Sequence, residues 1–570
     1  MAQRSADDVA RVLRQRPIIS YFGGEDSEEE IDNVEEADSD DSESHVSDKQ
    51  SEEDESVVED EPETVEGSRR RKFVYGKDKH QWCLTTPESR GRRSNITIIL
   101  PKVIGAAARS RTILEIWSTL FTQDILNIVL KYTNAEIERF IQDNNDCASF
   151  QPITLNELKA FIGLLYFGGM QNNNRVNLTE IWSREFGSKL HKATMSQRRF
   201  EFISCRLRFD DKATRSARRL EDALAPIRQI WDIFIQNCQN NYTPSQFLTI
   251  DEQLLGFRGR FSGRVYIKSK PARYGIKIVS MNDAKTFYMY NAIPYTGKVQ
   301  TEQGESVPSY YVRKLSEPIH NTHRNITCDN WFTSVEICNK MKKNFNISMV
   351  GTLRKNKRQI PESFKRNVSI GAARYGYDGQ NILLSYCPKK NKVVLLLSSM
   401  HKTGKACENN GKPEIIEFYN KNKCGTDVFD QLCGNYSCTR TTSRWPMRFF
   451  LGMLDQASVN GCILYNFLPE NENKNKREFL KELSLALIKP HLQDRLTTNG
   501  MHKSIVNGII EILGLNEFDN PILKTDKLTK RKRCHFCKSD KDKKTGYCCI
   551  KCQKPVCEEH RCVCCAHCVQ

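Results

Sequence analysis

Apolar residues recur at helical spacing over two long stretches of the chain. One covers residues 112–142 (TILEIWSTLFTQDILNIVLKYTNAEIERFIQ) and the other covers residues 154–170 (TLNELKAFIGLLYFGGM). A period near 3.6 residues predicts helices. Thr154, with Glu157 three residues later, resembles a capping box at a helix start. The chain from residue 101 to residue 246 is therefore predicted to form a helical domain.

The pattern changes at Phe247 to short runs rich in β-branched and aromatic residues. The runs FLTIDEQLLGFRGR, RVYIKSK, YGIKIVSMND and TFYMYNAIPYTG are separated by Gly, Pro and Asn, which predicts an antiparallel meander. They are followed by a helix (ESVPSYYVRKLSEPI), a strand (NITC), a second helix (TSVEICNKMKKN) and a last strand (ISMVGTLR). This order matches an RNase H-like core, with residues 247–354 as its first part.

The remaining segments complete a multidomain α/β organisation. Lys- and Asn-rich loops with short strands over residues 355–415 indicate an insertion, and residues 416–436 are predicted to be the last helix of the core. Helical periodicity over residues 437–515 resembles that of the first helical domain. A basic linker, residues 516–533, leads to a cysteine-rich segment at residues 534–570.

Charge is distributed unevenly along the 570 residues. The formal net charge is +16, but residues 25–66 hold 22 acidic residues and one basic residue, a net of −21. The rest of the chain carries 85 basic and 48 acidic residues, a net of +37. A strongly basic body is typical of proteins that bind nucleic acid.

The acidic segment has no aromatic residue, so it cannot bury enough apolar surface to fold. Residues 1–100 are therefore predicted to be a disordered acidic region, and serines beside its acids suit an acid-directed kinase. The cluster RRRK at residues 69–72 is a candidate nuclear signal. Neither a signal peptide nor an apolar run of about 18 residues is evident, which predicts an intracellular protein that does not bind a membrane.

Four aspartates lie where strands or helices are predicted to end. Asp251 follows the run FLTI, Asp329 follows NITC, and Asp427 and Asp430 share a helix face in GTDVFDQ. In the predicted topology the first and fourth strands are neighbours, and the late helix packs across them. Converging carboxylates can bind two Mg²⁺ ions about 3.5–4 Å apart for phosphoryl transfer. Any one aspartate, taken alone, is more often a cap or a surface acid.

The sequence segments around these aspartates resemble those of a known family. LTIDEQLLGFRGR, NITCDNWFTS, GTDVFDQ and SRWPM are similar, in the same order, to motifs of the piggyBac DNA transposases, and the resemblance extends over residues 95–568. It implies a nuclear, cut-and-paste transposase that excises through hairpin ends and inserts at TTAA. By position, the implied catalytic triad that binds Mg²⁺ or Mn²⁺ is Asp251, Asp329 and Asp427, with Asp430 as a further important acid.

Partners also follow from the resemblance. The protein is expected to bind double-stranded DNA, both transposon ends and target, and to act as a homodimer because two ends must be cut and joined. The helical segments 101–246 and 437–515 would form one dimerisation and DNA-binding domain that is split by the core.

Basic residues follow the first aspartate, with Tyr266 and Tyr274 interleaved. Cations there would offset the repulsion between aspartates and DNA phosphates, and tyrosines can stack on bases, although they more often pack a sheet. The resemblance connects Arg354 and Lys357 with target DNA and Trp445 with DNA opening. The residues predicted to contact DNA are Arg258, Arg260, Lys268, Arg273, Tyr274, Lys277, Arg354, Lys357, Arg440, Arg444 and Trp445, and the basic run also contains Arg264 and Lys270.

Ten of the 22 cysteines lie between Cys534 and the last residue. Pairs spaced by two residues predict two tetrahedral Zn²⁺ sites in a cross-brace. The first site would use Cys534, Cys537, Cys557 and His560, and the second Cys549, Cys552, Cys565 and Cys568. Cys548 is an alternative to Cys549. The resemblance supports this register and implies that the domain recognises the terminal repeats.

Two other functions remain open at this point. A domesticated DNA-binding protein could keep the fold without cleaving DNA, and a zinc-dependent ubiquitin ligase could use the same cross-brace spacing.

Overall fold

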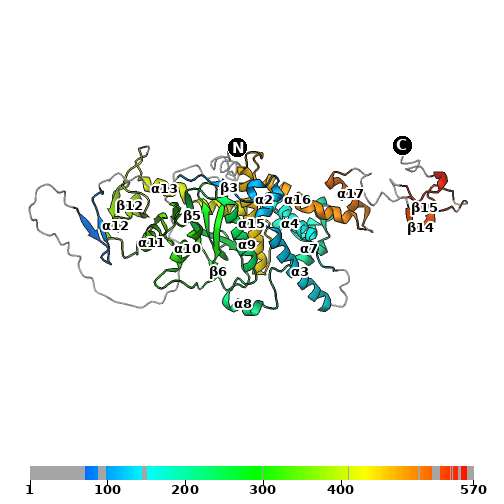
Figure 1. Cartoon of the computed structure of the whole chain (residues 1–570), viewed down its shortest axis with the longest axis horizontal. Coiled ribbons are helices and arrows are strands. Elements are labelled where there is room, and N and C mark those ends of the chain that lie inside the picture. Colours follow the sequence, from blue (N-terminus) through cyan, green and yellow to red (C-terminus); the bar gives the residue numbers. More distant parts are fainter. Residues whose placement is uncertain are drawn as a thin grey trace, which may run out of the picture. The chain divides into compact units, whose positions relative to one another are not determined.

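The computed structural model describes residues 71–87, 98–143, 150–297, 299–366, 368–408, 410–498, 501–515, 527–538, 541, 543–549 and 554–560. The chain divides into two compact units (Figure 1). Of the described residues, the first unit contains those up to 104 and those from 242 to 432, and the second contains those from 105 to 241 and those from 433 onward. The acidic segment at residues 25–66 lies outside the described residues.

One mixed sheet forms the centre of the first unit. Its strand order is β1-β2-β11-β12-β13-β10-β9-β5-β7-β6, and β8 also pairs with β7. Strand β9 is parallel to both β5 and β10, and the other pairs are antiparallel. The strands are β1 (Phe73–Tyr75), β2 (Gln81–Cys83), β5 (Phe247–Gly256), β6 (Arg264–Tyr266), β7 (Tyr274–Asp283), β8 (Met289–Pro294), β9 (Asn325–Cys328), β10 (Ser348–Thr352), β11 (Ala373–Tyr377), β12 (Ile382–Lys389) and β13 (Lys392–Ser398). A separate short pair joins β3 (Lys102–Val103) to β4 (Tyr242–Thr243).

The strands predicted after Phe247 are confirmed, and their register positions two of the aspartates. Residues 247–250 of β5 lie beside residues 325–328 of β9 in parallel register. Asp251 and Asp329 are the residues that directly follow these two paired segments. Asp329 follows the end of β9 as predicted, but the strand end predicted at Asp251 is wrong, because β5 continues past it to Gly256 by pairing with β7. The two aspartates meet where the parallel pairing of β5 with β9 stops.

The strands of the predicted insertion belong to the same sheet. Strand β13 pairs with β10 through Val350↔Ser398, and β12 and β11 continue outward from it. The run KVVLLLS of β13 is buried from Val393 to Ser398. Burial of this apolar run against the core explains why the segment extends the sheet instead of standing apart.

Residues 71–87 form a hairpin that the sequence did not indicate. Strand β2 pairs with β11 at Cys83↔Tyr377. The Trp82 side chain is fully buried, and its Nε1–H donates to the carbonyl oxygen of Gln359 at 2.8 Å. The expectation of disorder is wrong for these residues, because Trp82 buries the apolar surface that the acidic segment lacks.

Helices cover the sheet of the first unit. Helix α10 packs on β7 and β8, α11 on β10, and α13 on β5, β10 and β13. The helices are α10 (Val307–Ser316), α11 (Val335–Phe345), α12 (Glu362–Lys365), α13 (Glu414–Asn422) and α14 (Gly425–Gly434). The single last helix predicted for residues 416–436 is therefore wrong. Helix α13 ends at Asn422, where the Thr249 hydroxyl of β5 donates a hydrogen bond to the Asn422 carbonyl oxygen. This carbonyl is therefore bound by the sheet and not by a further turn of helix.

The second unit is helical on both sides of the first unit in sequence. Helix α4 packs on α16, and α2 packs on α15. The helices are α2 (Ile113–Leu120), α3 (Gln123–Asp143), α4 (Leu155–Met170), α5 (Leu178–Ile181), α6 (Lys189–Thr194), α7 (Gln197–Arg206), α8 (Arg215–Glu221), α9 (Arg228–Asn240), α15 (Trp445–Phe467), α16 (Lys476–Leu496) and α17 (Lys503–Leu513). The stretch predicted as helical over residues 112–142 bends by 69° between α2 and α3. Among the described residues no single helix could span a membrane by length and apolarity, and only this bent pair passes that criterion.

The predicted capping box at Thr154 is half formed. The Thr154 side chain accepts the Glu157 N–H at 3.1 Å, as expected. The Glu157 carboxylate, however, binds the Arg199 guanidinium at 2.7 Å instead of returning to the cap. A charged partner outcompetes a backbone N–H because charge-assisted hydrogen bonds are the stronger ones.

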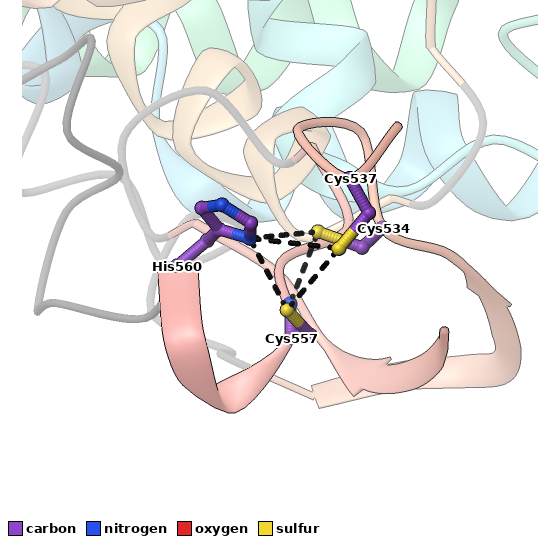
Figure 2. A group of neighbouring side chains, drawn as sticks. All are labelled: Cys534, Cys537, Cys557 and His560. Carbon is purple, nitrogen blue, oxygen red and sulfur yellow. Dashed lines mark hydrogen bonds between the residues drawn. The ribbon is translucent and has the colours of Figure 1, made fainter. Parts of the chain in front are cut away.

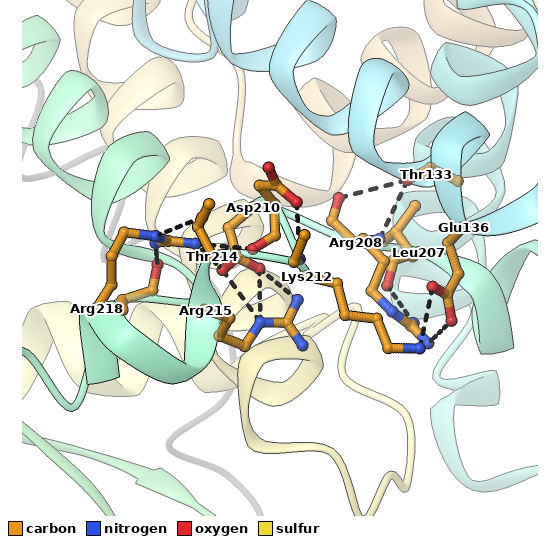
Figure 3. Close-up of polar contacts among 12 residues, drawn as sticks. Thr133, Glu136, Leu207, Arg208, Asp210, Lys212, Thr214, Arg215 and Arg218 are labelled. Carbon is orange, nitrogen blue, oxygen red and sulfur yellow. Dashed lines mark hydrogen bonds and ion pairs between the residues drawn. The ribbon is translucent and has the colours of Figure 1, made fainter. Parts of the chain in front are cut away.

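Other arginines of this unit also pair with buried acids, as Figure 3 shows. Arg208 contacts Glu136 at 2.6 Å, and Arg218 contacts Asp210 at 2.7 Å. Burial raises the pKa of Glu136, but the charges of Arg208 and Lys212 overcome it, so this pKa is lowered. These arginines stabilise the helical unit, and part of its positive charge is neutralised internally.

Candidate active site and metal centre

Asp251 and Asp329 are half-buried and form the acidic site together with Asp427 and Asp430 of α14. Burial, and then the charges of Glu252, Asp329 and Asp427, raise the pKa of Asp251 well above its usual value. Burial and the charge of Glu252 likewise raise the pKa of Asp329 to about 6. The Trp331 N–H donates to Asp329 Oδ1 at 3.0 Å and fixes this carboxylate in the turn before α11. The site therefore crowds carboxylates together, which disfavours their charged forms.

Helix α14 brings the third aspartate to the same place. At its first residue, Gly425, an added Cβ would lie 2.9 Å from Thr249 Oγ1 on β5, so glycine permits a close approach. The Thr426 hydroxyl then donates to Asn282 Oδ1 on β7 at 3.1 Å. These contacts hold the first turn of α14, which carries Asp427, against the strand that carries Asp251.

Lys270 reaches into this group from the turn between β6 and β7. Its Nζ donates to Asp427 Oδ1 at 2.9 Å and lies 4.0 Å from Asp430 Oδ2. Burial lowers the pKa of Lys270, but the charges of Asp427 and Asp251 outweigh burial and raise it above the usual range. The sequence placed Lys270 in a basic run, and nothing in that run distinguished it from its neighbours.

The acidic site has the chemistry of a divalent-cation site. Its donors are carboxylate oxygens, which Mg²⁺ and Mn²⁺ prefer. Burial, and after it the charges of neighbouring carboxylates, raise the pKa of Asp251 and of Asp329, and a bound cation would offset both effects. Among the described residues, only the C-terminal cysteine cluster gathers three or more donors within 4.8 Å of one another. The aspartates are less tightly gathered, and Asp427 is engaged by Lys270.

Most of the basic residues predicted to contact DNA near Asp251 are exposed: Arg258, Arg260, Lys268 and Arg273. Tyr266 and Tyr274 are 53% and 41% exposed, with their ring centroids 4.9 Å apart, so they do not pack the sheet interior. Lys277 differs, because its Nζ lies 4.0 Å from the Trp331 ring centroid.

The other predicted DNA contacts are partly engaged within the protein. Arg354 donates to Asn330 Oδ1 at 3.1 Å, and Lys357 is half-buried. Arg440 donates to two backbone carbonyls, at 3.0 and 2.8 Å. Arg444 donates to the carbonyls that end α7, and Trp445 is buried at the start of α15. These contacts give Arg440 and Arg444 a structural role, and their DNA contacts stay a prediction.

The first predicted zinc site is assembled in the structure (Figure 2). The donor atoms of Cys534, Cys537, Cys557 and His560 all lie within 4.8 Å of one another. Cys557 Sγ lies 3.2 Å from His560 Nδ1, and Cys537 Sγ lies 3.6 Å from Cys557 Sγ. A tetrahedron with Zn–S bonds of about 2.3 Å has edges of about 3.7 Å, so the cluster fits zinc.

Backbone N–H groups stabilise the thiolate form of Cys534, which is the form that binds a metal ion. Burial raises the pKa of Cys534, but the N–H groups of Cys557 and Phe536 outweigh it and lower the pKa to about 6. The cluster is held by β14 (Lys527–Arg533), which pairs with β15 (Lys544–Tyr547). Of the second predicted set, Cys549 is buried, and Cys552, Cys565 and Cys568 lie outside the described residues.

Comparisons with known proteins agree with this arrangement. The family model described as transposase IS4 matches residues 113–462. Human piggyBac transposable element-derived protein 3 is 22% identical over 361 residues, which cover 59% of this chain and 58% of that protein. The human chimeric ERCC6-PGBD3 protein is also 22% identical, over 59% of this chain and 32% of that protein. The chain thus matches less than two thirds of the length of either relative.

A solved structure gives a more extensive match. The piggyBac transposase in a cryo-EM synaptic complex with hairpin DNA is 35% identical, with a TM-score of 0.71, and the match covers 82% of this chain and 99% of that one. The fold and the family model together place the chain in a family of transposases. This chain belongs to the transposase IS4 family, and its relatives place it among the piggyBac-type members.

Proposed function

We propose that this protein is an active cut-and-paste transposase that excises a DNA element through hairpin ends and inserts it at TTAA. The observation that carries the proposal is the convergence of Asp251, within β5, and Asp329, directly after β9, where the parallel pairing of these strands stops, with Asp427 supplied by α14. The strand order β8-β7-β5-β9-β10 supports an RNase H-like catalytic core. The structural relative, a transposase complex with hairpin DNA, supports the hairpin route.

Each residue of the site has a part in phosphoryl transfer. Two Mg²⁺ or Mn²⁺ ions would be held by Asp251, Asp329 and Asp427. When bound, such ions would lower the pKa of the attacking water or 3′-hydroxyl and stabilise the leaving 3′-oxygen. The backbone N–H of Trp331 fixes the Asp329 carboxylate. The contacts of Gly425 and Thr426 fix the start of α14, so that positions of the ligands do not depend on a flexible loop.

The exposed cations around the site would receive DNA. Arg258, Arg260, Lys268 and Arg273 offset the phosphate charge, and the neighbouring pair Tyr266 and Tyr274 offers faces for stacking. We further propose that the protein works as a nuclear homodimer, since two ends must be synapsed. The Cys534 cluster and a second site would bind one Zn²⁺ each, in a module that recognises transposon ends.

A cell-free excision assay tests the catalytic proposal. The substrate is a plasmid cassette flanked by the DNA segments taken from either side of the gene. The reaction contains Mg²⁺ or Mn²⁺, and its products are resolved on a denaturing gel. The wild-type protein should give hairpin ends, and Asp251→Asn should lose them by at least about 10³-fold while binding the ends equally well. Lys285→Met, a charge change on the β7–β8 turn, is the matched control.

Either of two results would refute the proposal and favour another function. End binding without cleavage by the wild-type protein would indicate a domesticated DNA-binding protein. Ubiquitin chains formed with a conjugating enzyme, in the absence of DNA, would indicate a ligase built on the zinc module.

A further inference from the structure

Lys270 differs from the cations that flank it in the same turn. Lys268 and Arg273, two and three residues away, are exposed, whereas the side chain of Lys270 is only 17% exposed. Its ammonium group lies on the two carboxylates of α14, and Asp427 itself is 59% exposed. An accessible carboxylate does not need a partly buried partner for solvation, so this pairing is a specific feature of the site.

The turn that carries Lys270 is built to present it. Pro271 follows Lys270, the Arg273 N–H donates to the Lys270 carbonyl at 3.0 Å, and the Ile267 N–H donates to the Arg273 carbonyl at 2.8 Å. Arg273 takes a left-handed conformation with φ of 56°. Closed at both ends, the turn fixes the backbone of Lys270, and only its four-carbon side chain is free to move.

A divalent ion and the Lys270 ammonium would use the same oxygen. With Nζ 2.9 Å from Asp427 Oδ1, a cation bound to that oxygen at about 2.1 Å would lie within a few ångströms of the ammonium and repel it. The scissile phosphate, brought to the same carboxylates, carries the charge that a displaced ammonium would attract.

We propose that Lys270 is an internal cation of the resting site: it holds Asp427 and Asp430 until divalent metal displaces it, and it then binds the scissile phosphate. This inference rests on the proposed phosphoryl-transfer function. It makes Lys270 a direct contact of the substrate and a competitor of the metal, so the site is electrostatically balanced before metal and DNA arrive. The same side chain would thereby oppose metal binding in the absence of DNA.

Metal affinity measured without DNA tests the competition. Mn²⁺ is titrated into the zinc-loaded full chain, and free Mn²⁺ is followed by electron paramagnetic resonance. Lys270→Met removes the charge and keeps the length, so its Kd for Mn²⁺ should fall about five-fold, the effect expected of one partly buried ion pair. Lys270→Arg keeps the charge and should stay within about two-fold of wild type. Lys285→Met, a charge change on the β7–β8 turn, should leave the Mn²⁺ affinity unchanged.

Cleavage at saturating Mn²⁺ tests the phosphate contact. Lys270→Met should lower the single-turnover rate constant by about 10²-fold or more with little change in end binding, and Lys270→Arg should recover part of it.

The outcomes separate the two proposals. Unchanged or weaker Mn²⁺ binding in Lys270→Met overturns the competition, and if Asp251→Asn still loses Mn²⁺ binding, the proposed metal site stands. A full cleavage rate in Lys270→Met overturns the phosphate contact. Equal Mn²⁺ binding by wild type and Asp251→Asn overturns the proposed metal site, and the inference about Lys270 falls with it.

Discussion

Trp82→Ala is expected to release the N-terminal hairpin from the sheet and to leave the catalytic strands folded. The Trp82 side chain is fully buried beside Gly376, and its Nε1–H donates to Gln359 at 2.8 Å. Truncation of a buried tryptophan costs about 3–5 kcal/mol, including the cavity left behind. Strands β1 and β2 are three residues each. Apart from Trp82, the hairpin meets the rest of the unit through few contacts, such as His80 Nε2 with Asp378 Oδ2 at 3.3 Å, so this cost should fall on the hairpin.

Amide hydrogen exchange measures that local cost. Since 1.4 kcal/mol corresponds to a factor of ten, amides of β1 and β2 should exchange about 10²–10³-fold faster, while those of β5 and β7 keep their protection. Trp82→Phe fills most of the cavity and loses the hydrogen bond, so it should cost only about 1 kcal/mol. Unchanged exchange in the hairpin, or equal acceleration across all strands, would refute this account of what holds the hairpin.

Further predictions address the other features of the fold. Gly425→Ala should push α14 away from Thr249, lowering the free energy of unfolding by about 1–3 kcal/mol and weakening Mn²⁺ binding; an unaltered Mn²⁺ titration would contradict this. Burial and the Arg440 charge lower the pKa of His191 to about 4. As the pH falls, His191 therefore takes up a proton in the unfolded chain before it does so in the folded chain. The free energy of unfolding should therefore fall from pH 6.5 to pH 4, by up to about 1.4 kcal/mol per pH unit. His191→Leu should flatten that slope in urea titrations, and an identical slope would exclude His191 as the cause. Cys537→Ser should remove one zinc per chain by metal analysis and weaken end binding while the helical far-UV signal persists; full zinc content would count against the cluster. Deletion of residues 1–68 should raise DNA affinity at low salt, because a segment of −21 competes with phosphate, and identical salt titrations would contradict this.

The sequence predicted those parts of the molecule whose signals are local. Strands β5, β7 and β9 follow from β-branched runs, and the aspartates from the motifs around them, although β5 continues past Asp251. Contacts between distant residues had no such signal. Trp82 meets Gln359 across 277 residues, and the break after α13 depends on Thr249, which lies 173 residues before Asn422. Lys270 looked like any other cation of a basic run until the fold placed Asp427 beside it.

The distance in sequence between Trp82 and Gln359 has a consequence for folding during translation. The first strand of the sheet to leave the ribosome is β1, yet the strand that receives its hairpin, β11, follows only after the chain has passed Gln359. At about 5–20 residues per second, Trp82 waits roughly 14–55 s for its acceptor. During that time an apolar side chain without its partner is available to chaperones or to other nascent chains. Expression hosts that translate slowly or lack chaperone capacity should therefore yield less soluble protein, with the sheet edge as the point of failure.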